Sequence, residues 1–351
     1  MQIAGSAVSA DRSNRRKRPT QADVARQAGV SQAMVSYVLN DKAEEVSAET
    51  RERILAVIDD LGYVLDGAAR SLRTRKTQTI ACIIPDITNP FYPALERGIQ
   101  RSAEAEGYDL IVSNTDGVAG MESHALRSLR GGRADGAVMV PFHVDRERVR
   151  EVTSAGIALT MLYPPDVALL ELGVDMIEVD TGEGARMAVD YLIAKGHQRI
   201  GMIAGIANTP PREYRLAGYR QALHSHGLPA DDLLIRGADY QEEGGHEAMV
   251  ELLRLEERPT AVFAANDLMA LGAMMAIREA GLRIPDDIAI VGLDDIPAAK
   301  LVHPPLTTVA QFPDRLGQLA AELLFSRLRG EAPDSGRLLR HACELIVRDS
   351  A

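Results

Sequence analysis

The hydrophobic pattern of the chain changes twice along its length. Residues 1–18 are rich in Ser and Arg and show no periodicity, while residues 19–65 show three short helical patterns without a strand between them. From Thr77 onward, nearly continuous apolar runs alternate with amphipathic stretches. We therefore expect a disordered basic arm over 1–18, a small all-α domain over 19–65, a linker over 66–76 and an α/β body over 77–351.

The apolar runs of the body have the continuous character of parallel strands that are buried on both faces. They are TIACIIP, DLIVSNT, GAVMVPF, ALTMLY, MIEVD, RIGMIAG, DLLIRGA, AVFAAND and IAIVGLDD. Repeated β-α units predict a doubly wound parallel sheet, and about nine strands exceed what one compact sheet usually holds. We therefore expect two lobes, with lobe 1 over about 77–178 and 310–336 and lobe 2 over about 179–309 and 337–351.

The stretch PTQADVARQAGVSQAMVSYVLN predicts two helices joined by a tight turn. Thr20 is a good N-cap with Asp23 as its capping-box partner, Gly29 permits a left-handed turn, and Ser31 caps the second helix. Ser47 caps a third helix. Apolar residues are expected to face inward on all three helices: Val24, Ala25, Ala28, Val35, Val38, Leu39, Ile54, Val57, Ile58 and Leu61.

The outer face of the second helix carries almost no charge. Gln32, Ser36 and Asn40 form a row at intervals of four residues, with Ala33 and Tyr37 beside it. A solvated helix face usually carries Lys and Glu, whereas a face that reads base edges carries amides, hydroxyls and small residues. The alternative is an ordinary three-helix bundle, but the turn and the uncharged face favour a DNA-binding helix-turn-helix.

Charge is distributed unevenly between the two halves. Residues 1–76 carry 13 Lys and Arg against 10 Asp and Glu, and the remaining residues carry 26 against 40. A basic head on an acidic body suggests that the head binds a polyanion, although chance and a solvated tail would give the same count.

The sequence lacks the features that are typical of several classes of protein. There is no apolar run of about 20 residues, no secretory signal, no phosphate-binding glycine motif, no nucleophile elbow and no His cluster. Cys82 and Cys343 are interpreted as buried free thiols. We expect a cytoplasmic, nucleoid-associated protein that is not an enzyme, with no catalytic residue, cofactor, metal or membrane partner.

The chain from about Pro19 to its end resembles the LacI/GalR family of bacterial transcription regulators. The resemblance rests on ADVARQAGVSQAMVSYVLN, VSAETRERI and LGYVLDGAARSLRT in the head, and in the body on DITNPFY, GHQRIGMIAG, REYRLAGY, FAANDLMALGAM, IPDDIAIVGLDDI and PPLTTV. It implies a helix-turn-helix headpiece on a core like the periplasmic binding proteins. The implied function is that of an effector-controlled regulator, most simply a repressor.

The resemblance also implies DNA contacts. Gln32 and Ala33 match base-reading positions, and Tyr37 stands where the family most often has Arg, so the usual operator base is in doubt there. Phosphate-contacting positions are matched by Thr20, Ser31, Ser36 and Asn40; for Thr20 and Ser31 helix capping is an equally good role. In the linker, Leu72 matches a residue that wedges into a base step and Arg73 a minor-groove contact; the alternative is a flexible linker.

In the body, the resemblance and the carboxyl ends of the strands point to an effector pocket. Its implied residues are Phe91, Tyr163, Arg215, Tyr240, Asn266 and Asp294. The family commonly has a carboxylate at the Tyr163 position, so we expect a less acidic first-lobe wall and an effector that need not be a plain sugar. Asp86 and Asp267 have N-capping as their alternative role, which we prefer for Asp267.

We expect a homodimer on palindromic double-stranded operator DNA, controlled by a small molecule such as a sugar or a sugar derivative. The end of the chain, LIVRDSA, shows no heptads for a tetramer. Competing functions are a solute-binding receptor without a DNA function and an enzyme that uses Asp294 and Asp295 as an acid/base pair. Neighbouring residues on a strand point to opposite sides, which disfavours the enzyme.

Overall fold

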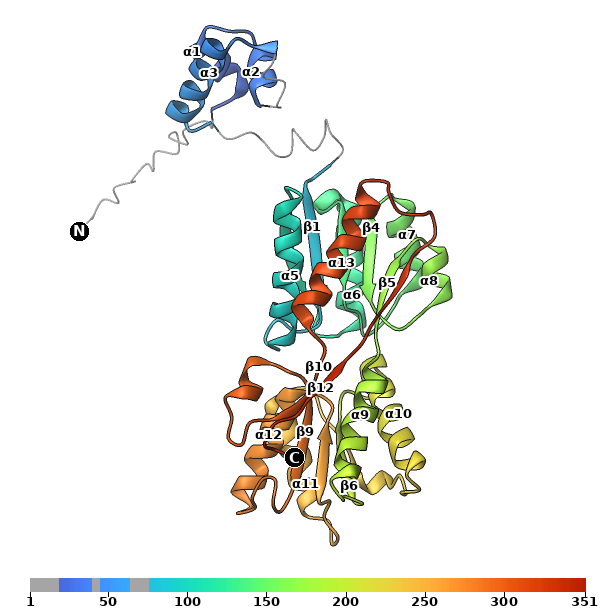
Figure 1. The fold of residues 1–351 in the computed structure, drawn as a ribbon. Helices are drawn as coiled ribbons and strands as arrows, with labels where there is room; N and C mark the ends of the chain where they lie inside the picture. Colours follow the sequence, from blue (N-terminus) through green and yellow to red (C-terminus); the bar gives the residue numbers. More distant parts are fainter. Residues whose placement is uncertain (1–18, 40–44, 64–75) are drawn as a thin grey trace, which may run out of the picture. The chain divides into compact units, whose positions relative to one another are not determined.

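The computed structural model describes residues 19–39, 45–63 and 76–351, which belong to two units divided after Thr77. The arm, Asn40, Leu72 and Arg73 lie outside the described residues, so their predicted roles stay predictions. The described part of the first unit, called the head below, contains α1 (Gln21–Ala28), α2 (Gln32–Leu39) and α3 (Ala48–Leu61) (Figure 1).

The helix starts of the head follow from its sequence. The Thr20 hydroxyl accepts a hydrogen bond from the Asp23 amide at 3.3 Å, and the Asp23 carboxylate accepts one from the Thr20 amide at 2.9 Å. Gly29 ends α1 with φ at 66°, where a side chain would be strained, and the Ser31 hydroxyl accepts from the Met34 amide at 3.3 Å. The Ser47 hydroxyl accepts from the Thr50 amide at 3.3 Å, so the capping predictions for Thr20, Ser31 and Ser47 and the predicted turn at Gly29 are confirmed.

The core of the head is small. Val24, Val35 and Ile54 are fully buried, and each contributes roughly 1.5–3 kcal/mol by leaving water. Val57 and Ile58, predicted to point inward, are only half-buried against this core. Three short helices leave the far side of α3 partly open.

The described body, residues 78–351, contains two six-stranded sheets, which confirms the two-lobe α/β architecture (Figure 1). The first has the order β11-β5-β4-β3-β1-β2 and the second β12-β10-β9-β8-β6-β7. The strands are β1 (Thr79–Ile84), β2 (Asp109–Asn114), β3 (Gly136–Met139), β4 (Ala158–Leu162), β5 (Asp175–Val179), β6 (Ile200–Ala204), β7 (Ile235–Gly237), β8 (Ala261–Ala264), β9 (Ala289–Asp294), β10 (Thr307–Ala310), β11 (Leu338–His341) and β12 (Glu344–Ile346). All pairings are parallel except that of β10 with β12.

Helices cover both faces of each sheet. In lobe 1, α5 and α13 pack on one face and α6, α7 and α8 on the other. In lobe 2, α9 packs against α10 and α11 against α12 (Figure 1). The bounds are α5 (Phe91–Ala105), α6 (Ala119–Ser128), α7 (Arg146–Ser154), α8 (Val167–Glu171), α9 (Thr181–Ala194), α10 (Pro210–Ser225), α11 (Glu242–Leu253), α12 (Asp267–Glu279) and α13 (Pro313–Leu328), with short turns η2 (Leu129–Arg133), η3 (Asp232–Leu234) and η4 (Pro297–Lys300).

The predicted lobe boundary at residue 337 differs from the structure. Strand β11 pairs in parallel with β5, so it belongs to the sheet of lobe 1, and the chain returns to lobe 2 only between His341 and Glu344. The chain passes between the lobes three times: from β5 to α9, from β10 to α13 and from β11 to β12.

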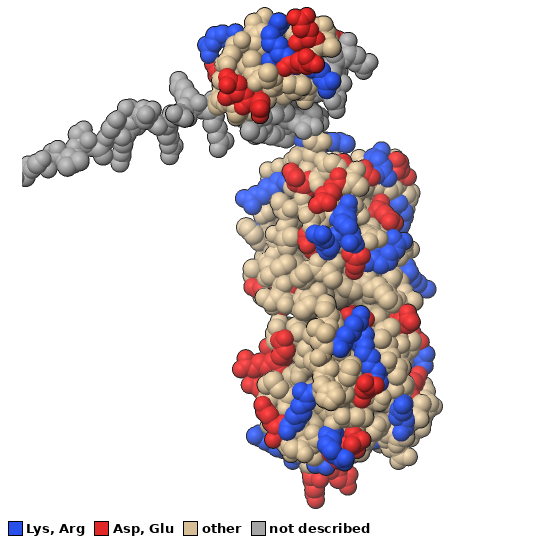
Figure 2. Space-filling model, turned by 60° about the vertical axis from the view of Figure 1, so that its left-hand side comes forward, with Lys and Arg blue, Asp and Glu red and all other residues tan. Residues whose placement is uncertain are grey.

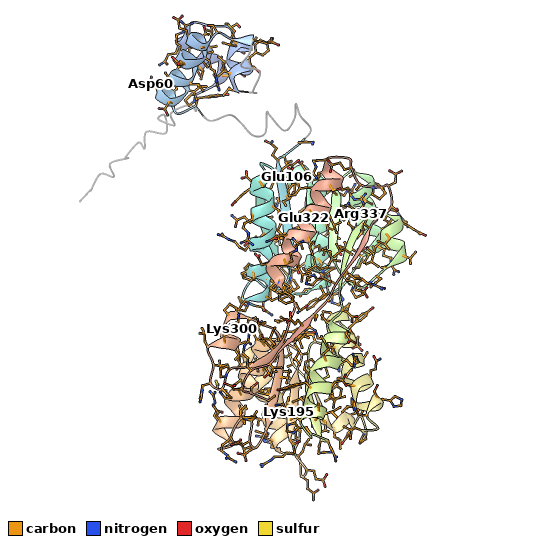
Figure 3. The ribbon with its side chains drawn as sticks, viewed as in Figure 1. Asp60, Glu106, Lys195, Lys300, Glu322 and Arg337 are labelled. Carbon is orange, nitrogen blue, oxygen red and sulfur yellow. The ribbon has the colours of Figure 1, made fainter. Side chains whose placement is uncertain are left out.

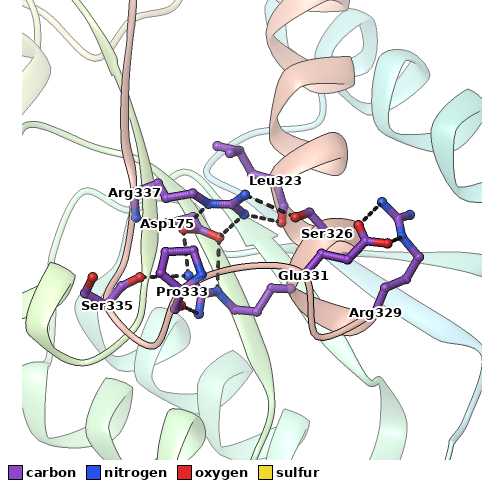
Figure 4. Close-up of polar contacts among 9 residues, drawn as sticks. Asp175, Leu323, Ser326, Arg329, Glu331, Pro333, Ser335 and Arg337 are labelled. Carbon is purple, nitrogen blue, oxygen red and sulfur yellow. Dashed lines mark hydrogen bonds and ion pairs between the residues drawn. The ribbon is translucent and has the colours of Figure 1, made fainter.

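A buried polar cluster fixes the segment that leads into β11 (Figure 4). Asp175, fully buried at the start of β5, accepts hydrogen bonds from Arg327 at 2.8 Å and from both the backbone and the guanidinium of Arg337 at 2.8 Å. Burial alone would raise the pKa of Asp175, but the hydrogen bonds from Arg337 and Arg327 outweigh it and lower that pKa. This cluster holds the start of β11 beside β5.

Charged side chains occupy the outer surface of the body. Glu106 and Lys195 stand at the ends of α5 and α9, and both signs are interspersed over the face in view (Figures 2 and 3). Cys82 is buried in β1, but Cys343 is only half-buried between β11 and β12. No helix in the described ranges is long and apolar enough to cross a membrane.

Candidate functional site

A cavity of about 350 Å³ lies where the carboxyl ends of both sheets meet. All six residues predicted for the effector pocket line it: Phe91, Tyr163, Arg215, Tyr240, Asn266 and Asp294. The structure brings them together from strand ends and helix starts of both lobes. Their role in binding stays a prediction.

The lobe 1 wall begins with Phe91, the first residue of α5. The Asn89 carboxamide accepts a hydrogen bond from the Phe91 amide at 3.0 Å, and the ring of Phe91 meets that of Tyr92 edge-on, with centroids 5.2 Å apart. Tyr163 follows β4 and is half-buried. The rings give this wall flat apolar faces of the kind that cover sugar or base rings.

Tyr240 of lobe 2 is held in an unusual position. Its φ is 70°, its ring lies 6.0 Å from that of Phe142, and a Cβ at Gly205 would lie 1.8 Å from its Cζ atom. Only glycine at position 205 therefore leaves room for the ring. The buried Tyr240 hydroxyl has no hydrogen-bond partner within the described part of the chain.

Arg215 is the buried cation of the cavity, with 8% of its surface exposed. Its Nη1 donates to the Ala265 carbonyl at 2.6 Å, and the guanidinium lies 5.9 Å from the centroid of the Tyr240 ring. Its Nε is buried without a partner among the described residues. A buried donor without a partner costs about 1–3 kcal/mol, so this group is ready for a ligand oxygen.

Asp294 ends β9 with φ at 132° and is 5% exposed. One carboxylate oxygen accepts from the Gln311 carboxamide at 2.5 Å. Burial raises the pKa of Asp294 well above its ordinary range; the Arg215 charge opposes this rise and the neighbouring Asp267 adds to it. A carboxyl that keeps its proton near neutral pH both donates and accepts hydrogen bonds.

Asn266, and not Asp267, is the N-cap of α12. The Asn266 carboxamide caps α12 by accepting from the Met269 amide and donates to the Tyr240 carbonyl, both at 2.9 Å. The fully buried Asp267 accepts from the Thr308 hydroxyl at 2.5 Å and from the Ile296 amide at 2.9 Å. The capping interpretation of Asp267 is therefore wrong, because α12 begins at Asp267 itself, one residue earlier than that role requires.

Sequence reasoning missed several residues of the cavity. Gln311 follows β10, a strand that was not predicted. Phe142 follows β3, and an aromatic residue after a predicted strand could have indicated a cavity residue there.

Gln241 of lobe 2 donates to Asp86 of lobe 1 at 2.5 Å and so links the lobes directly.

The first-lobe wall includes three carboxyl groups, since Asp86, Asp116 and Glu178 line the cavity from lobe 1 together with Tyr163. That this wall is less acidic than is common in the family stays a prediction. The acid/base pair of the enzyme alternative is not assembled, since Asp295 does not line the cavity and its carboxylate binds Arg348 at 2.5 Å.

The head presents the predicted face of α2. Gln32 and Ala33 are exposed, whereas Ser36 and Tyr37 are half-buried, and the Tyr37 ring packs partly on the core. Residues 19–39 and 45–63 carry three Arg against six Asp and Glu, and Figure 2 shows both signs on this unit. The predicted positive excess therefore comes from the arm and the linker.

No group of three or more potential ligand side chains in the described part of the chain is arranged to hold a metal ion. Chemically, the cavity offers hydrogen bonds and flat apolar faces to a small molecule.

Comparison with known proteins gives two matches to family models. Residues 20–66 match the bacterial regulatory proteins of the lacI family, and residues 189–351 match the periplasmic binding protein-like domain. The ribose operon repressor of Escherichia coli (strain K12) is 38% identical over 309 residues, which are 88% of this chain and 93% of that protein.

Solved structures agree over nearly the whole chain. The Lac repressor dimer bound to operator and the anti-inducer ONPF has a TM-score of 0.82 at 29% identity, covering 95% of this chain and 99% of that one. The complex of the transcriptional regulator CelR with cellobiose has a TM-score of 0.71 at 32% identity, covering 95% and 100%.

Proposed function

Because the chain belongs to the LacI family of bacterial regulatory proteins, we propose that it is a cytoplasmic repressor whose operator affinity is set by a small molecule in the interlobe cavity. Family membership makes it a transcriptional regulator with a DNA-binding helix-turn-helix. The observation that carries the proposal is the cavity, where Arg215 Nε and the Tyr240 hydroxyl are buried without partners in the described chain.

The DNA side of the proposal rests on α2. Gln32 at the start of this helix is exposed and free to form paired hydrogen bonds with an adenine edge, while Ala33 is small enough to approach a thymine methyl group. Tyr37 in place of a guanine-binding Arg predicts a different base at that position. Thr20 and Ser31 serve as caps and still present oxygens to phosphates.

A homodimer is supported by exposed apolar residues. Strand β2 is an edge strand of its sheet and exposes Ile111 and Val112, and Leu301 of lobe 2 is 84% exposed. An exposed edge strand is able to pair with another chain, and neighbouring exposed apolar side chains are able to form an interaction surface. Two heads then read two half-sites, which predicts a palindromic operator.

The effector is proposed to be a sugar or a sugar derivative. The CelR structure contains cellobiose, and the cavity of this chain combines aromatic faces with buried hydrogen-bonding groups. Sugars have hydroxyls around a ring with apolar faces and are therefore matched by such a lining.

The test begins by selecting a duplex from a random-sequence pool with the full-length protein. Binding is then followed through a dye on the DNA, since the chain has no Trp. We expect the selected duplex to bind at least about 1,000-fold more tightly than random DNA at physiological salt, and to contain two inverted half-sites. Equal affinity for both DNAs would contradict the proposal.

A further inference from the structure

We propose that the effector is an uncharged molecule at least two rings long, with one ring in the inner cavity and a second ring in an adjoining outer cavity between the lobes. The proposal rests on the function above and extends it from a small molecule of sugar type to a ligand of defined length and charge.

The outer cavity has a volume of about 380 Å³ and shares part of its wall with the inner one. Tyr163, Pro164, Pro210 and Tyr214 line both. The two volumes are therefore neighbours, and a ligand that fills the inner cavity has room to continue past these four residues.

The shared wall has the right surface for a ring. Tyr163 and Pro164 follow β4 of lobe 1, and Pro210 and Tyr214 belong to the first turns of α10 in lobe 2. Tyr214 is 44% exposed although it is aromatic. A sugar ring or an aromatic ring between these side chains covers apolar surface that otherwise faces water.

The charges around both cavities disfavour an anion. The inner cavity has six carboxyl groups, from Asp86, Asp116, Glu178, Asp180, Asp239 and Asp294, against the single guanidinium of Arg215. The outer cavity adds Asp166 and Glu213. Arg146 pairs with Asp166 at 2.7 Å and Arg212 with Glu213 at 2.8 Å. Arg212 Nε has no partner among the described residues, but Arg212 is not part of the wall of either cavity.

The start of α10 also lacks the usual anion-binding groups. The N-terminus of a helix attracts phosphate through its free backbone N–H groups. Here Pro210 and Pro211 occupy the first two helical positions and have no N–H to donate. A phosphorylated sugar would therefore meet several carboxyl groups with one guanidinium, that of Arg215, in the described lining of the two cavities.

The inner cavity, in contrast, requires a polar ring. Arg215 Nε and the Tyr240 hydroxyl are buried without partners in the described chain and need a ligand group to bond. A hydroxyl-bearing ring satisfies both groups. The outer ring needs only an apolar face and a neutral charge, so a disaccharide and an aryl glycoside both fit the proposal.

The experiment measures thermal shift and calorimetric affinity of the full-length protein with matched compounds. The single rings are glucose, galactose, xylose and ribose; the two-ring compounds are cellobiose, lactose, xylobiose and the 4-nitrophenyl glycosides of all four; the anions are glucose 6-phosphate and ribose 5-phosphate. We expect a two-ring compound to bind about tenfold more tightly than its single ring. A factor of about ten is the gain in affinity that the stacking of one additional ring provides. The phosphates should not bind.

Two variants locate the second ring. Tyr214 lines both cavities, so Tyr214→Ala should weaken the two-ring compound at least about fivefold more than its single ring, and Tyr214→Phe should keep the gain because it keeps the ring. The inference is overturned if a single ring or a phosphate binds most tightly, if no two-ring compound binds, or if Tyr214→Ala weakens both ligands equally. The proposed function fails separately, if a bound ligand leaves operator affinity unchanged.

Discussion

At the scale of residues, side-chain hydrogen bonds fix where the helices α1, α2 and α12 begin. Thr20, Ser31 and Gly29 follow from capping and turn rules, and the aromatic residues at strand ends reached the cavity as expected. Asn266 and Asp267 did not follow, because either residue is able to cap a helix and a shift of one residue in the helix start decides between them.

Asp294 leads to a prediction on pH dependence. Its pKa is raised in the folded protein, chiefly by burial, so the unfolded chain ionises it first as pH rises above about 4. Wild type should therefore lose stability as pH rises from about 4 towards neutrality, at about 1.4 kcal/mol for each unit of pKa difference. The Asp294→Asn variant has no ionisable group at this position, so it should lose less stability than wild type over the same pH range.

Urea unfolding at pH 5 and pH 7 measures this difference. Asp239→Asn, which removes an exposed carboxylate of the same cavity, is the control and should keep the wild-type pH dependence. Identical pH dependence of wild type and Asp294→Asn would show that Asp294 is ionised in the folded protein.

Gln32 leads to a prediction on base reading. Gln32→Ala should weaken binding to the selected duplex by about 1–3 kcal/mol and change binding to random DNA little, because a base contact is lost and no phosphate contact. Fluorescence anisotropy with a labelled duplex measures both affinities. Gln27→Ala, a Gln of α1 bonded to Asp60, is the matched control; equal weakening on both DNAs would leave Gln32 a positioning role only.

At the scale of elements, the missed strands share a cause. Thr307 and Thr308 interrupt the apolar run of β10, β11 alternates between exposed and half-buried positions, and β12 has three residues. Such short or polar segments form strands because a neighbouring strand pairs with them. The local sequence pattern carries no information about this pairing. The other nine strands carry apolar runs of their own and were predicted, although β2 and β7 lie at sheet edges and are not buried on both faces as expected.

The cluster around Asp175 leads to a prediction on stability. Asp175→Ala removes the shared acceptor of Arg327 and Arg337 and leaves two partly buried guanidinium groups unpaired. We expect a loss of about 3 kcal/mol, measured by urea unfolding of the full chain. Glu331→Ala breaks the exposed pair with Arg329 and should change little. A loss below about 1 kcal/mol for Asp175→Ala would mean that β11 is held by its strand pairing alone.

At the scale of the whole molecule, charge is separated along the chain. The described head is acidic, so the positive charge available to DNA is concentrated in Arg12, Arg15, Arg16, Lys17 and Arg18 and in the linker. Composition predicted the polyanion partner from residues 1–76 taken together. Only the structure shows that the folded helices do not supply this charge.

Replacing these five basic residues by Gln should lower the salt dependence of DNA binding. Each phosphate contact that is lost reduces the slope of log affinity against log salt by about 0.9. Titrations of the labelled duplex measure this change in slope. They cover salt concentrations from about 50 to 200 mM, a range over which such slopes are commonly compared. An unchanged slope would show that the arm does not contact phosphates.

The central claim is that ligand binding in the body changes the DNA affinity of the head. The most direct measurement is the affinity of the full-length protein for its selected duplex with and without a saturating ligand from the thermal-shift screen, in wild type and in Asp294→Ala. We predict a change of about 5- to 150-fold in wild type, typical of allosteric coupling, and none in Asp294→Ala, whose affinity without ligand should match wild type. A ligand that binds the body while leaving wild-type operator affinity unchanged would contradict the account.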